Sequence, residues 1–94
     1  MTEPVLWRRS AFADLSRIVA SIREQNPIAA QRIGQELLLA GDSLALFPKR
    51  GRRGRVPGTR ELVTVWPYVI VYETVDDQPV LILRVWHGAQ NRDG

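Results

Sequence analysis

The chain contains no cysteine and no long apolar run, and its only histidine is His87. Without cysteine, neither a disulfide nor a thiolate metal site can support the fold, and this composition favours a reducing compartment. The first ten residues lack the apolar core of a signal peptide, and no apolar segment of about 18 residues occurs. These absences predict a cytoplasmic protein with no membrane partner.

Motifs for several catalytic and cofactor chemistries are also missing. The stretch "GRRGR", residues 51–55, lacks the Gly-Lys-Ser/Thr ending and the following helix of a phosphate-binding loop. Neither a metal-ligand spacing nor a Ser-His-Asp arrangement is visible. We therefore expect neither a metal nor a cofactor.

What is present is typical of one small globular domain spanning residues 1–94. Of the 94 residues, 45% are apolar and 24% are charged, which argues against disorder. The net charge of +3 is unevenly distributed, because residues 49–60 contain six cations and no acid while the flanking segments are neutral or acidic. The six cations are Lys49, Arg50, Arg52, Arg53, Arg55 and Arg60.

The sequence predicts a first helix from Ser10 to about Gln25. Its apolar residues recur at helical spacing, and Ser10 is a good N-cap residue. Asp14, close to the first turn, suits the positive end of the helix dipole. The helix is expected to stop where Asn26 precedes Pro27, because the residue before a proline disfavours helical geometry.

Asn26 and Pro27 also predict the start of a second helix, as an N-cap followed by proline at the first helical position. This helix should run to about Phe47. The link between the two helices is so short that they must form an antiparallel hairpin. Gly34 and Gly41 lie on or beside the expected buried face and predict a close crossing of the two helices.

Four strands are expected around this hairpin. Residues 4–8 begin with a proline and suit an edge strand. Residues 60–66, 68–75 and 80–87 are rich in β-branched and aromatic residues, whereas residues 48–59 are a loop by composition. The order β-α-α-β-β-β predicts an α+β fold, with the helical hairpin packed on one face of a largely antiparallel four-stranded sheet.

Strand alternation divides the last predicted strand into two faces. Leu81, Leu83 and Val85 form the more apolar face, which we expect to belong to the core. Arg84 and Trp86 are then expected side by side on the open face.

His87 lies where this strand ends, and two interpretations of it remain open. It can simply form hydrogen bonds at the end of a strand, or it can act as a general acid or base. Catalysis would need further acids or bases and cations near the same point. The residues that could supply them are Arg84, Arg60, Tyr68 and Tyr72.

The basic segment, residues 49–60, also has two interpretations. Charged runs are often solvated connections, but five arginines among twelve residues exceed what solubility requires. The arginine fork suits contacts to phosphate or carboxylate groups. We therefore expect an anionic partner, either a nucleic acid or an acidic protein segment.

Six stretches together resemble the RelE/ParE superfamily of toxins from bacterial type II toxin–antitoxin modules. They are "FADLSRIVASI", "NPIAA", "LALFPKRGRRG", "GTREL", "PYVIVYE" and "ILRVWHGAQNR". They occur in the order typical of the family and extend from about Val5 to Arg92. The resemblance implies a compact α+β toxin that arrests growth and is associated with plasmid stabilisation.

The superfamily divides into RelE-like ribosome-dependent mRNA endoribonucleases and ParE-like poisons of DNA gyrase. RelE-like nucleases typically carry an arginine where this chain has Val69, and they often have an essential tyrosine in a C-terminal extension. No aromatic residue follows Trp86 here. The resemblance therefore favours the ParE-like branch and a non-catalytic, gyrase-binding toxin, with the ribonuclease as the alternative. A degenerate relative that has lost toxicity is a third possibility.

The resemblance also implies partners and site residues. A cognate antitoxin would wrap the toxin and bind operator DNA, while gyrase or the ribosome would be the target. If the chain is a ribonuclease, its catalytic residues are expected to be His87, Arg84 and Arg60. The residues expected to contact the target or the antitoxin are Arg50, Arg52, Arg53, Arg55, Trp86 and Arg92.

Overall fold

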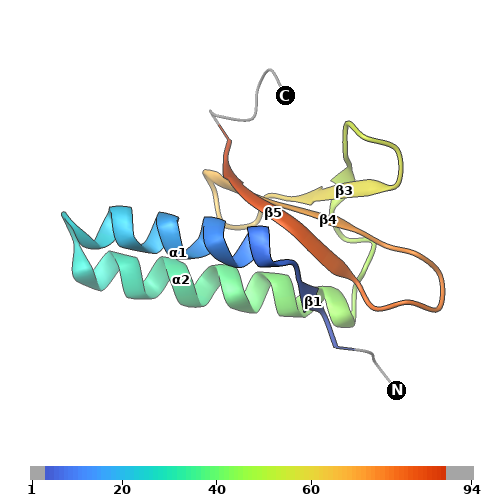
Figure 1. Cartoon of the computed structure of the whole chain (residues 1–94), viewed down its shortest axis with the longest axis horizontal. Helices are drawn as coiled ribbons and strands as arrows, with labels where there is room; N and C mark the ends of the chain where they lie inside the picture. Colours follow the sequence, from blue (N-terminus) through green and yellow to red (C-terminus); the bar gives the residue numbers. More distant parts are fainter. Residues whose placement is uncertain (1–3, 89–94) are drawn as a thin grey trace.

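The computed structural model describes residues 4–88, which form a helical hairpin packed against one sheet (Figure 1). The predicted order of strands and helices is confirmed, with one additional strand. The elements are β1 (Leu6–Trp7), α1 (Arg9–Arg23), α2 (Pro27–Asp42), the 3-10 helix η1 (Ser43–Ala45), β2 (Arg52–Arg53), β3 (Thr59–Leu62), β4 (Tyr68–Glu73) and β5 (Leu81–His87).

The sheet has the strand order β1-β5-β4-β3-β2. β1 is an edge strand, as predicted, and pairs in parallel with β5, while the other neighbours are antiparallel. The expectation of four strands was wrong, because residues 52 and 53 pair with β3 inside the segment predicted as a loop. Local composition could not reveal β2, since its pairing depends on a strand that follows it in the chain.

The helix starts were predicted with mixed success. Asn26 caps α2 as expected, its Oδ1 accepting a hydrogen bond from the Ala29 N–H at 3.0 Å. Ser10 is not the N-cap of α1, because the helix starts one residue earlier and the Ser10 hydroxyl donates to Leu83 O at 2.8 Å. The hydroxyl therefore joins α1 to β5 instead of closing the helix end.

The two glycines of α2 allow close packing, but against different neighbours. A Cβ at Gly34 would lie 3.1 Å from Val19 of α1, as expected for a tight helix crossing. A Cβ at Gly41 would instead overlap the Trp7 ring and lie 2.9 Å from Ile82. Gly41 therefore fits α2 against β1 and β5, and the prediction that it serves the helix crossing was wrong.

A bulge in β5 changes which of its side chains are buried. Val71 pairs with Arg84, whereas its neighbour Tyr72 pairs with Ile82, so Leu83 has no partner in the register. Such an extra residue reverses the alternation of the side chains that follow it. The core therefore contains Ile82 and Val85, while Leu81 and Leu83 are only half-buried. The prediction of Leu81 and Leu83 as core residues was wrong for this reason.

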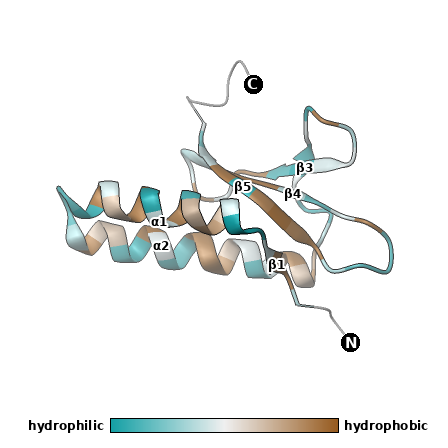
Figure 2. Ribbon diagram, viewed as in Figure 1, coloured by the Kyte–Doolittle hydropathy of each residue, from teal (hydrophilic) through white to brown (hydrophobic). Residues whose placement is uncertain are grey.

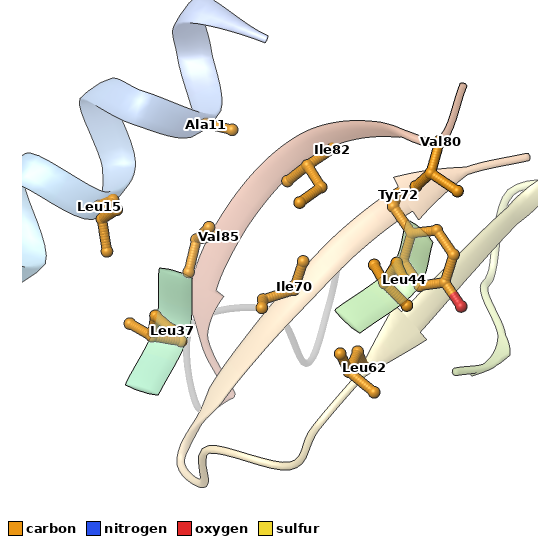
Figure 3. Close-up of a cluster of buried hydrophobic side chains, with 10 residues drawn as sticks. All are labelled: Ala11, Leu15, Leu37, Leu44, Leu62, Ile70, Tyr72, Val80, Ile82 and Val85. Atoms are coloured by element: carbon orange, nitrogen blue, oxygen red, sulfur yellow. The ribbon is translucent and has the colours of Figure 1, made fainter. Parts of the chain in front are cut away.

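The core lies between the helical hairpin and the covered face of the sheet (Figure 3). Hydrophobic segments run along β5 and recur on both helices (Figure 2). The ten residues of this cluster are Ala11, Leu15, Leu37, Leu44, Leu62, Ile70, Tyr72, Val80, Ile82 and Val85.

Replacing Ile70 by alanine should lower the free energy of unfolding by about 2–5 kcal/mol, because its side chain is 1% exposed. Leu83→Ala should cost clearly less, since Leu83 is only half-buried. Chemical denaturation of both variants measures the difference. Equal losses would contradict the position of the bulge.

Candidate functional site

The carboxylate of Asp14 joins α1 to the bulged part of β5. Its side chain is 2% exposed, yet it accepts four hydrogen bonds. Arg84 binds it through two atoms, with Nε 2.7 Å from Oδ2 and Nη2 3.0 Å from Oδ1. The Val85 N–H donates to Oδ2 at 2.9 Å, and Arg17 Nη2 donates to Oδ1 at 2.9 Å. Asp14 was expected to act on the helix dipole, but its direct partners lie mainly on the sheet.

These contacts explain the charge state of the pair. Burial alone would raise the pKa of Asp14, but hydrogen bonds from Arg84 and Val85 and the two arginine charges outweigh it and lower the pKa. The hydrogen bond that Arg84 donates to Asp14 in turn raises the pKa of Arg84. Both groups are therefore charged at neutral pH, and Arg84 is held in one orientation.

A pocket of about 510 Å³ opens between α1 and the ends of β4 and β5. Arg84 and His87 both line it, so the structure brings together these two predicted catalytic residues. The His87 ring meets the Tyr68 ring edge to face, with centroids 5.6 Å apart. The Arg84 guanidinium carbon lies 5.7 Å from the centre of the Trp86 ring, as predicted for neighbouring side chains. The pocket is thus lined by cations and aromatic rings.

Arg60, the third predicted catalytic residue, does not line this pocket. Its Nη1 donates to Gly51 O at 2.8 Å and Lys49 O at 3.3 Å, so the guanidinium anchors the start of the basic segment. Among residues 4–88, the only carboxylate that lines the pocket is that of Asp14, and two arginines already neutralise it. The arrangement is better suited to binding an anionic or aromatic group than to transferring protons.

Tyr72 holds the same segment from within the core. Its hydroxyl donates to Pro48 O at 2.8 Å and accepts from the Gly51 N–H at 2.9 Å. Burial raises the pKa of Tyr72, so its hydroxyl stays protonated and can keep donating. A Cβ at Gly51 would lie 2.7 Å from this oxygen, which explains the need for glycine. The basic segment is therefore anchored to the sheet and is not a loose connection.

The predicted contact arginines differ in how they are held. Arg52 forms an ion pair with Glu61 at 3.0 Å, and Arg50 donates to the Ser43 hydroxyl at 2.8 Å. Arg53 and Arg55 are exposed, and no hydrogen bond or ion pair holds their side chains within residues 4–88. Arg92 lies outside the described residues.

A second pocket, of about 310 Å³, lies over β3, β4 and β5. Its walls include the apolar side chains of Val56, Val71 and Leu83, with Arg8 and Arg55 beside them. Arg84 and Trp86 line both pockets. Arg84 and Trp86 therefore join the two pockets, and Arg55 links the second pocket to the basic segment.

Two further observations concern the described part of the chain. None of its helices is long and apolar enough to cross a membrane. Within residues 4–88, no group of three or more histidine, aspartate or glutamate side chains could hold a metal ion.

Asp14→Asn should lower the free energy of unfolding by about 1.5–3 kcal/mol at neutral pH, because charged hydrogen bonds to Arg84 are lost. The pKa of Asp14 is lowered by folding, so its contribution is complete above the unfolded-state pKa and is lost as pH falls through the folded-state value. The stability difference between the two proteins should therefore shrink below about pH 4.

Denaturation curves at several pH values measure this difference, with Glu24→Gln at the exposed end of α1 as the matched control. A difference that does not change with pH would contradict the role of the Asp14 charge.

Comparison with known proteins places the chain in one family. The family model "ParE toxin of type II toxin-antitoxin system, parDE" matches residues 5–92. Toxin RelE2 of Caulobacter vibrioides is 45% identical over 86 residues, covering 92% of this chain and 96% of the relative. Putative toxin Y4kP of Sinorhizobium fredii is 40% identical, covering 92% of this chain and 88% of the relative.

A solved structure agrees with these sequence matches. A chain of the chromosomal ParDE toxin–antitoxin system from P. aeruginosa superposes with a TM-score of 0.80 at 27% identity. The superposition covers 92% of this chain and 96% of the other. The resemblance drawn from the sequence motifs is thus confirmed. The chain belongs to the ParE toxin family of type II toxin–antitoxin systems.

Proposed function

We propose that the chain arrests growth by binding and poisoning DNA gyrase, without itself catalysing a reaction, and that a cognate antitoxin neutralises it. The observation that carries this proposal is that the three candidate catalytic residues, His87, Arg84 and Arg60, are not free to act together on one phosphate. The Arg84 guanidinium is bound by Asp14, and the Arg60 guanidinium is bound by backbone carbonyls away from His87. A toxin that acts by binding alone does not require Arg84, Arg60 and His87 to meet at one point. In-line RNA cleavage does, because it needs an acid, a base and cations around one phosphate.

Val69 supports the same branch. Its side chain is 2% exposed in β4, paired with Trp86 of β5. An arginine at this position, as in the RelE-like pattern, would not fit where Val69 is buried, so the side chains around Trp86 would have to be arranged differently. In this chain the buried Val69 brings no charge to the strand pair beside Trp86.

A ribosome-dependent ribonuclease is the second candidate. Arg17, Tyr68, Arg84 and His87 line one pocket, which supplies cations and possible proton carriers for such a reaction. One of the relatives described above, Toxin RelE2, is also named as a RelE toxin. In this hypothesis His87 is the general acid or base, and Arg84 stabilises the negative charge of the phosphate.

The antitoxin would contact the basic segment and the second pocket. Arg53 and Arg55 are exposed cations, and Arg55 and Trp86 line that pocket. Arg50 and Arg52 would extend this contact, and Arg92, which lies outside the described residues, is a further expected contact. Operator DNA would be bound by the antitoxin and not by this chain.

Purified gyrase distinguishes the two activities. The gyrase proposal predicts that added toxin inhibits supercoiling and traps cleaved DNA, and that His87→Gln retains this effect. Unimpaired supercoiling and no cleaved DNA at saturating toxin would reject the proposal.

Growth experiments test the two alternatives. Loss of toxicity in a folded His87→Gln protein would favour the ribonuclease. Growth that is unchanged when the chain is expressed without antitoxin would indicate a toxin that has lost its activity.

The double variant Arg53→Gln/Arg55→Gln should bind the antitoxin roughly 3–10 fold more weakly, because exposed ion pairs each contribute little. Arg23→Gln, at the exposed end of α1, removes a cation far from this surface and should leave the affinity unchanged. Titration calorimetry at two salt concentrations measures both effects. Equal affinities for all three proteins would place the antitoxin contact elsewhere.

A further inference from the structure

The outer face of α2 carries large apolar side chains that neither α1 nor the sheet covers. Ile28 is 81% exposed, Leu39 is 70% exposed, and Leu46, just past η1, is 65% exposed. Residues 28, 32, 35, 39 and 42 follow one another at spacings of four and three, which keeps them on one stripe of α2, and residue 46 follows four positions later, just past η1. The buried residues Ala30, Leu37 and Leu44 lie on the opposite side. α2 therefore buries one face in the core and carries exposed apolar side chains, interspersed with polar ones, on the opposite face.

The charges on this stripe are poorly placed within a single molecule. Asp42 is in the last turn of α2, where the helix dipole disfavours a carboxylate, and no basic residue accompanies it there. No ion pair holds Asp42 within residues 4–88. Arg32 lies toward the other end of the helix and has only an exposed contact with Glu36, at 3.3 Å. Among residues 4–88, each charge thus lacks a strong partner of opposite sign.

We infer that this stripe is a contact between two copies of the chain. The two α2 helices run antiparallel, and a two-fold axis crosses the stripe midway along it, at the level of residue 37. In that register Ile28 lies opposite Leu46 of the second copy, and Arg32 lies opposite its Asp42. Gln35 lies opposite the second copy's Leu39 at the centre. A two-fold axis makes every such contact twice.

The choice of a second copy, and not another protein, rests on this self-complementarity. The same stripe supplies the apolar ends and both signs of charge, in positions that match when it is reversed on itself. Alternating spacings of three and four are also those that allow two helices to pack along a seam. Because the seam is only a few turns long and half polar, its association is weak and depends on concentration.

Sedimentation of the purified chain from micromolar to sub-millimolar concentrations tests this inference. The chain should show a monomer–dimer equilibrium, and Leu39→Glu should abolish it. Val75→Glu is the matched control, because Val75 is also exposed but lies outside α2, and it should leave the dimer unchanged. Circular dichroism verifies that each variant is folded.

The charge contact is tested by a swap. Asp42→Arg should weaken dimerisation about tenfold, since it replaces two attractive contacts by two repulsive ones. The double variant Arg32→Asp/Asp42→Arg should recover most of the loss. Equal weakening in the single and double variants would contradict the pairing.

The absence of natural cysteine makes the register directly measurable. An oxidised mixture of Ile28→Cys and Leu46→Cys proteins should form a cross-linked heterodimer. Ile28→Cys alone should not cross-link, because the two positions 28 would lie about 27 Å apart along the seam. A monomer at all concentrations, or preferential cross-linking of Ile28→Cys to itself, would overturn the inference. A monomer whose Leu39→Glu variant no longer binds the antitoxin would assign the face to that partner instead.

Discussion

The structure depends on one buried carboxylate, Asp14, which joins the helical hairpin to the sheet. β1 pairs with β5 only as far as Ile82, so the remaining edge of β5 needs other partners. Ser10 and Asp14, one helical turn apart on α1, supply them by bonding Leu83 O and the Val85 N–H. The same carboxylate orients Arg84. One residue therefore fixes the helix–sheet contact, stabilises the bulge and positions a cation at both pockets.

This arrangement decides what the candidate site offers. Arg84 is held by Asp14 and lies over Trp86, and the second pocket continues toward Arg55 of the basic segment. Tyr72 and Arg60 anchor that segment from the other side of the sheet. The result is a preorganised surface of cations and aromatic rings, which suits recognition of an acidic or aromatic partner. Preorganisation limits the entropy lost on binding.

Patterns that depend on near neighbours could be predicted from the sequence. The Asn26-Pro27 start of α2, the edge position of β1, the pairing of β4 with β5 and the neighbouring Arg84 and Trp86 all follow from local rules. The features that failed depend on distant partners. β2 exists because Arg52 and Arg53 pair with β3, and the bulge at Leu83 changed the expected faces of Leu81, Ile82 and Leu83 but not of the residues after it. Asp14 and Tyr72 gained their roles through residues 21 to 71 positions away.

We propose that this ParE-family chain acts on gyrase by binding and does not cut RNA. Pulse labelling of DNA and protein synthesis after induction without antitoxin tests this most directly. The account predicts that DNA synthesis falls first, with gyrase covalently attached to broken DNA, while messages stay intact. An immediate fall in protein synthesis, with mRNA cleaved on the ribosome and DNA unbroken, would contradict it.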